Sequence, residues 1–190
     1  MEGWGNRNLA SAISHAVAAL GIGGCFARPG MPKGVWVAGV VCSVLPDVDV
    51  IGFRFGVQYG DFGGHRGFTH SLLFAALLAT LASFLNARHP ASNANHFMMW
   101  CYLFLATASH GFLDAMTDGG LGVAFFSPFN NDRYFLPWRP IRVSPIGIGR
   151  FFTERGFAVL QSEFLWIWIP AGVLVVSAWW LRRRSVAESE

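Results

Sequence analysis

The sequence predicts an all-α integral membrane protein, a polytopic bundle of about five membrane helices with one long, aromatic-rich interfacial loop. Of 190 residues, 53% are hydrophobic and 15% aromatic, whereas only 13% are charged. The charged fraction is about half that of an ordinary soluble domain. Five apolar segments approach or reach the roughly 20 residues that are needed to cross a bilayer. The chain has the length of one domain, so we expect residues 1–190 to form a single membrane domain.

The five segments cover residues 9–27, 34–53, 69–88, 96–118 and 163–181. The first has alanine and glycine at steps of three or four residues, which lets a neighbouring helix approach closely. It should therefore lie inside the bundle. The last has no charge between Phe164 and Leu181 and ends at three arginines, a typical stop at the lipid headgroups. Pro170 is expected to bend this C-terminal helix.

The longest connection, residues 119–162, contains four prolines and many aromatic residues. Loops of this length are usually functional or disordered, and the aromatic content argues against disorder. We expect this loop to cap the bundle along the membrane interface. Its five arginines against one Asp and one Glu account for the whole net charge of +3. This scatter favours an anionic lipid or a phosphorylated small substrate over nucleic acid, which needs a dense basic face.

The ionisable residues within or beside the apolar segments are few and are mostly of metal-binding type. A charge at the centre of a membrane helix costs about 2.5–3.5 kcal/mol on insertion scales, so each needs a partner or a function. If every segment crosses once, seven of these residues emerge toward the same membrane face. The sequence therefore predicts a metal site built from His15, Asp47, Asp49, His65, His70, His110 and Asp114.

Local spacing supports part of this set. His110 and Asp114 are four residues apart, so a helix presents both on one face to one ion. Asp47 and Asp49 can face the same way only in an extended chain, which leaves open whether one or both contact a metal. Arg66 lies between two histidines, where its guanidinium could clamp a phosphate oxygen.

Nitrogen and carboxylate ligands without a thiolate favour Zn²⁺, with Mn²⁺ as the main alternative. Six or seven ligands exceed the number that one tetrahedral catalytic zinc takes, which suggests two ions.

Such a site would activate water for hydrolysis of a phosphoester in a lipid or lipid-linked substrate. Arg66, helped by Arg133 or Arg139, would hold the phosphate, and Asp49 or Asp114 could act as a base. The alternatives are a divalent-metal transporter, or a metal-binding membrane protein without hydrolase activity. No feature of the sequence specifies an oligomeric state.

Three short motifs carry a resemblance to a known family. They are Leu45-Pro46-Asp47-Val48-Asp49, Gly64-His65-Arg66-Gly67-Phe68-Thr69-His70-Ser71 and His110-Gly111-Phe112-Leu113-Asp114. With the early His15, they resemble the YdjM-like family of membrane-bound, predicted metal-dependent hydrolases over roughly residues 10 to 150. The resemblance implies a multi-pass protein of the inner membrane, with His and Asp ligands at the matching positions. It does not supply a substrate.

Overall fold

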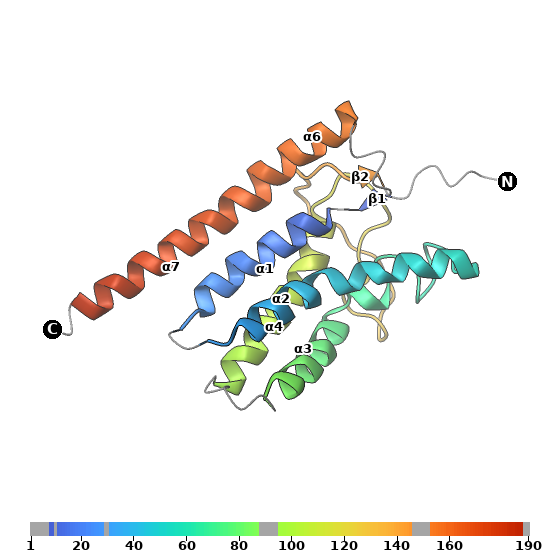
Figure 1. The fold of residues 1–190 in the computed structure, drawn as a ribbon. Coiled ribbons are helices and arrows are strands. Elements are labelled where there is room, and N and C mark those ends of the chain that lie inside the picture. Colours follow the sequence, from blue (N-terminus) through green and yellow to red (C-terminus); the bar gives the residue numbers. More distant parts are fainter. Residues whose placement is uncertain (1–7, 10, 29–30, 88–94, 146–152, 188–190) are drawn as a thin grey trace.

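Four helices form the centre of the structure, which is a computed structural model that describes residues 8–9, 11–28, 31–87, 95–145 and 153–187 (Figure 1). They are α1 (Ala12–Phe26), α2 (Lys33–Val44), α3 (Leu72–Ala87) and α4 (His96–Ala115). Side-chain caps begin two of them: the Ser11 hydroxyl accepts from the Ser14 amide, and the Asn95 side chain accepts from the amides of Phe97 and Met98.

The core of the bundle lies where α1, α2, α3 and α4 meet. Its buried residues are mostly small, with three larger side chains from α4: Ala19, Val35, Cys42, Ala79, Ala106, Met99, Tyr102 and Leu103. Small residues let the helices approach closely, and the Tyr102 ring fills the space between them. A Cβ at Gly39 would overlap the Tyr102 hydroxyl, so α2 needs glycine at that position. The prediction that α1 lies inside the bundle is confirmed, since it packs against α2, α4 and α7 (Ile169–Ala187).

A long helical rod runs beside α1 at the edge of the bundle (Figure 1). It consists of α6 (Glu154–Glu163), the π-helical turn η3 (Phe164–Trp168) and α7. The C-terminal helix therefore begins well before residue 163, and the loop predicted for residues 119–162 ends earlier than expected. Thr153 caps the new start by accepting from the Gly156 amide. The π turn immediately precedes Pro170, which has no amide to donate to the Trp166 carbonyl.

Within the described part of the chain, two helices are long and apolar enough to cross a membrane, Lys33–Phe55 and Glu154–Arg184. The second has a mean hydropathy of 1.8 and only 11% of its apolar window is buried, which is unlike a helix in the core of a soluble protein. α1 has 15 residues and α3 has 16, fewer than a perpendicular crossing needs. The predicted helical class is thus confirmed, and crossing by five helices stays a prediction.

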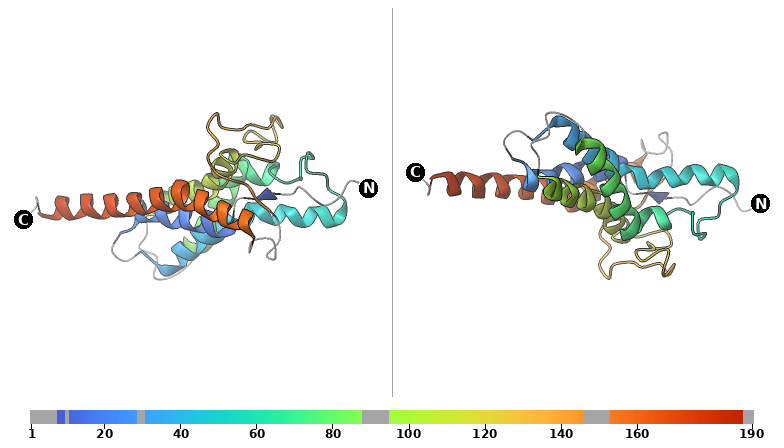
Figure 2. Two further views of the ribbon diagram at one scale, coloured as in Figure 1. Left: turned by 90° about the horizontal axis from the view of Figure 1, so that it is seen from above. Right: turned by 90° about the horizontal axis from the view of Figure 1, so that it is seen from below.

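The connections from α2 to α3 and from α4 to α6 gather at one end of the bundle. The 3₁₀ helix η1 (Leu45–Phe55) follows α2 and projects beyond the bundle, as Figures 1 and 2 show. The short 3₁₀ turn η2 (Phe68–His70) precedes α3. Two-residue strands, β1 (Asn8–Leu9) and β2 (Ser144–Pro145), pair antiparallel near the start of α1.

The described part of the long loop, residues 117–145, folds back onto this same end. Its backbone pairs with α4, since the Leu136 amide donates to the Ala115 carbonyl, and with the turn before α3, since Ala124 donates to Arg66. Val123 and Ile141 are fully buried. The loop therefore covers the end of the bundle where the predicted ligands lie. Residues 146–152 of the predicted loop lie outside the described residues.

Candidate metal centre

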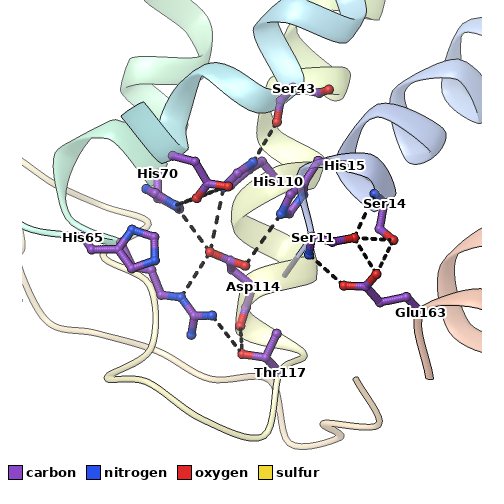
Figure 3. Close-up of polar contacts among 12 residues, drawn as sticks. Ser11, Ser14, His15, Ser43, His65, His70, His110, Asp114, Thr117 and Glu163 are labelled. Carbon is purple, nitrogen blue, oxygen red and sulfur yellow. Dashed lines mark hydrogen bonds and ion pairs between the residues drawn. The ribbon is translucent and has the colours of Figure 1, made fainter. Parts of the chain in front are cut away.

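The structure brings the seven predicted ligands to one end of the bundle, where Figure 3 shows His15, His65, His70, His110 and Asp114 close together. His15 comes from α1, the two η1 aspartates from the turn after α2, and His110 and Asp114 from the last part of α4. The 3₁₀ helix η1 continues directly from α2, which packs against α4, so Asp47 and Asp49 at the start of η1 lie beside the last part of α4. The predicted convergence is confirmed in the structure.

Four of the seven residues form a compact group: Asp47, His70, His110 and Asp114, each offering one ligand atom within 4.8 Å of the others. His110 Nε2 lies 3.2 Å from Asp47 Oδ1, and His70 Nε2 lies 3.3 Å from Asp114 Oδ2. Bonds of about 2.0–2.2 Å to a tetrahedral ion would set its ligands about 3.3–3.6 Å apart. The other separations are 3.0 Å between the two Nε2 atoms and 3.8 Å for both His70–Asp47 and His110–Asp114, so the group lies close to this range and has the size of a site for one ion.

The outer nitrogens of the two histidines fix which nitrogen faces the group. His110 Nδ1 lies 2.7 Å from the Ser43 carbonyl oxygen, which can only accept, so Nδ1 carries the proton. His70 Nδ1 lies 3.2 Å from Asp49 Oδ2 and is oriented in the same way. The two Nε2 atoms are then left facing each other at 3.0 Å. The lone pairs of the two Nε2 atoms and the carboxylates of Asp47 and Asp114 therefore point toward one space, where a cation could bind to all four.

His15 lies beside this group. Its ring stacks on the His110 ring with centroids 3.7 Å apart, and its Nε2 lies 3.8 Å from Asp114 Oδ1. Both ring nitrogens are buried without a hydrogen-bond partner in the described structure. A buried imidazole without a partner is costly, so His15 is well placed to be a further ligand.

Asp49 and His65 lie outside the compact group of four, on the far side of His70. The Asp49 carboxylate accepts from Thr69 Oγ1 at 2.7 Å, and its other oxygen lies 2.8 Å from His65 Nδ1. Asp49, His65 and His70 also form a second group that could hold an ion. Burial lowers the pKa of His65, although Asp49 opposes this shift, so the imidazole favours its neutral, metal-binding form.

Replacing Asp49 by alanine should weaken metal binding about 10- to 100-fold without unfolding the protein, because His70 and His65 both lose the carboxylate that orients them. A competition titration with a chromogenic chelator measures the change. Asp61→Ala is a matched control, since this exposed carboxylate accepts from the Gln58 amide away from the centre. Equal affinities for the two variants would contradict the orienting role.

Arg66 has partners within the protein on every side. Its side chain is fully buried, and Nε lies 3.1 Å from Asp114 Oδ2. Nη1 donates to the Gly119 carbonyl at 2.8 Å, and Nη2 donates to Thr117 Oγ1 at 3.0 Å. Its backbone is left-handed, with φ of 62°, a costly conformation for a residue with a side chain. The structure thus places Arg66 as a holder of Asp114, which differs from the phosphate clamp predicted from the sequence.

Comparison with known proteins identifies the family. The family model described as YdjM inner membrane protein matches residues 11–185. The chain belongs to this family. It is also 39% identical over 175 residues to the inner membrane protein YbcI of Escherichia coli (strain K12), covering 92% of this chain and all of that protein. No solved structure matches. Membership confirms the predicted resemblance, and it confirms the prediction that the chain is an inner membrane protein.

Sequence reasoning missed several contacts that build the centre of this YdjM family member, including those of Arg133, which it named only as a helper of Arg66 in holding phosphate. The Ser43 carbonyl orients His110, and Thr117 donates to the Asp114 carbonyl while it accepts from Arg66. Arg133 donates to the carbonyls of His65, Tyr59 and Asp61 and so fastens the turn that carries His65. Backbone acceptors leave no residue-type signal, so these roles become visible only in the fold.

The centre of this YdjM family member is almost closed. The side chains of His15, His70, His110 and Asp114 are fully buried, whereas that of Asp47 is 14% exposed. Asp47 is therefore the ligand through which the group is nearest to solvent.

Proposed function

We propose that the chain is a membrane-embedded, metal-dependent hydrolase of a phosphoester in a lipid or lipid-linked substrate. The observation that carries the proposal is the group of Asp47, His70, His110 and Asp114, with both Nε2 atoms turned inward by outer partners. Zn²⁺ suits this set of imidazole and carboxylate ligands, with Mn²⁺ as the alternative. We further propose that the protein is multi-pass and that α1, α3 and α4 lie in the membrane beside the two long helices.

A bound Zn²⁺ ion would lower the pKa of water toward neutrality and stabilise charge on the oxygen that leaves. The protein supplies the remaining parts. Arg66 holds the Asp114 carboxylate in place, and Asp49 holds His70 and His65. His15, whose ring nitrogens are buried without a hydrogen-bond partner in the described structure, can complete the ligand set. Asp49 has three partners already, so Asp114 and Asp47 supply the carboxylates nearest the ion.

The basic groups that could meet a phosphate lie on the loop side of the centre. Two cavities of about 590 Å³ each share Asp118, Val143 and Arg155 in their linings, and Arg142 lines one of them. The other is bounded by Tyr59 and Gly119–Leu121, next to the carbonyl that Arg66 contacts. The cavity with both arginines is also lined by Asp118 and Glu154, and the other has Arg155 beside Asp118. An anionic headgroup would pair with Arg155 in either space, and Arg66 separates the second space from the metal centre.

Purified protein in lipid nanodiscs should hydrolyse at least one member of a panel of phospholipids and soluble phosphoesters. Activity should fall to the uncatalysed rate after chelation and return with Zn²⁺ or Mn²⁺, because the nucleophile depends on the ion. Phosphate or headgroup release is the measurement. A metal-replete protein that hydrolyses no member of the panel would contradict the enzyme assignment.

One observation favours a second candidate, a metal-transporting or metal-binding membrane protein without hydrolase activity. Three of the four central side chains are fully buried, and a closed ligand set is typical of structural metal sites. Uptake of the ion into proteoliposomes would identify transport. Stoichiometric metal without uptake or hydrolysis would identify a structural site.

A further inference from the structure

The C-terminal rod touches α1 with an acidic side chain at one end and a basic side chain at the other. Glu163, at the end of α6, is fully buried; its carboxylate accepts from the Ser11 amide at 2.7 Å, from Ser11 Oγ at 2.5 Å and from Ser14 Oγ at 2.7 Å. Figure 3 shows this carboxylate beside Ser11 and Ser14 at the first turn of α1. A carboxylate at this end satisfies free amides and opposes the positive pole of the helix.

The other end of α1 carries the opposite arrangement. Arg182, near the end of α7, donates from Nη1 to the carbonyls of Gly24 at 2.9 Å and Ala27 at 3.2 Å. These carbonyls belong to the last turn of α1, where a cation satisfies free acceptors and opposes the negative pole. The next two arginines differ, since Arg183 and Arg184 lie over the rings of Trp179 and Trp180. The three arginines therefore do not act alike as a headgroup stop.

Between the two charged ends, α1 and the rod are locked in register by close packing. A Cβ on Gly21 would come within 2.7 Å of Ala171 Cβ, and one on Gly24 within 2.7 Å of Val175 Cγ2. The Trp168 indole also donates to Ser14 Oγ at 2.9 Å. α1 cannot slide along the rod without losing these contacts.

We propose that Glu163 and Arg182 are positioning residues that clamp α1 at both ends and thereby set His15 at the metal centre. The 15 residues of α1 span about 22 Å, less than the hydrocarbon layer, so its end groups need partners from the protein. His15 follows Ser14 directly, and its ring stacks on His110. The coupling to metal rests on the proposed function, in which His15 serves the ion.

The test compares Glu163→Gln and Arg182→Gln with Arg183→Gln, a neighbouring exposed arginine of the same rod whose guanidinium lies over the Trp179 ring. Titration of Zn²⁺ against a chelator in nanodiscs should show affinity lowered about tenfold in Glu163→Gln. Arg182→Gln should lower it about two- to fivefold, as expected for a charge at a helix end, and Arg182→Lys should restore most of it. Arg183→Gln should retain the wild-type affinity.

A double-mutant cycle separates positioning from general destabilisation. In a His15→Ala background, Glu163→Gln should lower metal affinity no further, because its effect acts through the missing imidazole. An equal loss in both backgrounds, or losses no greater than that of Arg183→Gln, would overturn the proposal. So would a His15→Ala variant that binds metal as tightly as wild type.

Hydrogen exchange distinguishes failure of the clamp from failure of the proposed function. Glu163→Gln should speed amide exchange in the first turn of α1, and Arg182→Gln should speed it in the last turn, with or without metal. If wild-type protein binds no metal, the proposed function and the link to His15 fail, and faster exchange at both ends still supports the clamp on α1. Unchanged exchange at both ends would refute the clamp itself.

Discussion

Replacing His110 by alanine should reduce the bound metal to less than about one tenth of the wild-type content, because two contacts of the centre disappear together. His110 Nε2 faces Asp47 at 3.2 Å and His70 at 3.0 Å, so it lies between two other ligands. Its loss leaves Asp47 with His70 at 3.8 Å as its remaining ion-pair contact in the described structure. Elemental analysis of protein purified in detergent measures the result, and hydrolysis, if present, should fall with it.

His96→Ala is the matched control for this experiment. His96 begins the same helix, is exposed and lies at the end of α4 that is far from the centre, so its variant should retain full metal content. Asp114→Asn adds a variant of nearly the same size and should also lose the ion, since an amide is a weaker ligand than a carboxylate. A His110→Ala variant that is folded and metal-replete would remove the assignment of this group as the metal centre.

The sequence was sufficient to predict the convergence of the ligands because successive antiparallel helices bring the end of one helix beside the start of the next. His15 lies near the start of α1 and His70 just before α3, whereas His110 lies near the end of α4, so helices that run in opposite directions bring all three to one end of the bundle. The spacing of His110 and Asp114 also placed both on one face of α4, where each now reaches His70. Topology and helical periodicity therefore predict which residues come together in most of the site.

Which atoms each of these residues contacts was not predictable in the same way. A 3₁₀ turn sends Asp47 to the central group and Asp49 to the outer nitrogens of two histidines, whereas the sequence left their directions open. Glu163 was treated as the edge of an apolar segment, although it is fully buried against α1. Side-chain direction within irregular turns depends on dihedral angles that residue type alone does not set.

Arg66→Met should lower the free energy of unfolding by about 3–5 kcal/mol, because the variant leaves the buried Asp114 charge without its guanidinium partner. The hydrogen bonds to Gly119 and Thr117 are lost as well, so the loop should loosen over the centre. Thermal and denaturant unfolding of metal-free protein in micelles measures the loss. Arg139→Met is the matched control, since this exposed arginine lies over the Phe135 ring at 4.6 Å and should change stability little.

Metal should partly rescue this variant, and the size of the rescue separates the two roles considered for Arg66. Zn²⁺ at about 100 times the wild-type dissociation constant stabilises the wild type by about 2.7 kcal/mol, and the same Zn²⁺ concentration is used for the variant. If Arg66 holds Asp114, the ion should stabilise Arg66→Met more than wild type, because it then supplies the only strong charge opposite that carboxylate. If Arg66 instead serves a substrate phosphate, Arg66→Met should be as stable as Arg139→Met and should lose only substrate affinity. Arg66→Lys separates the two roles further, since the variant keeps the positive charge. It loses the planar guanidinium that reaches Asp114, Thr117 and Gly119 together.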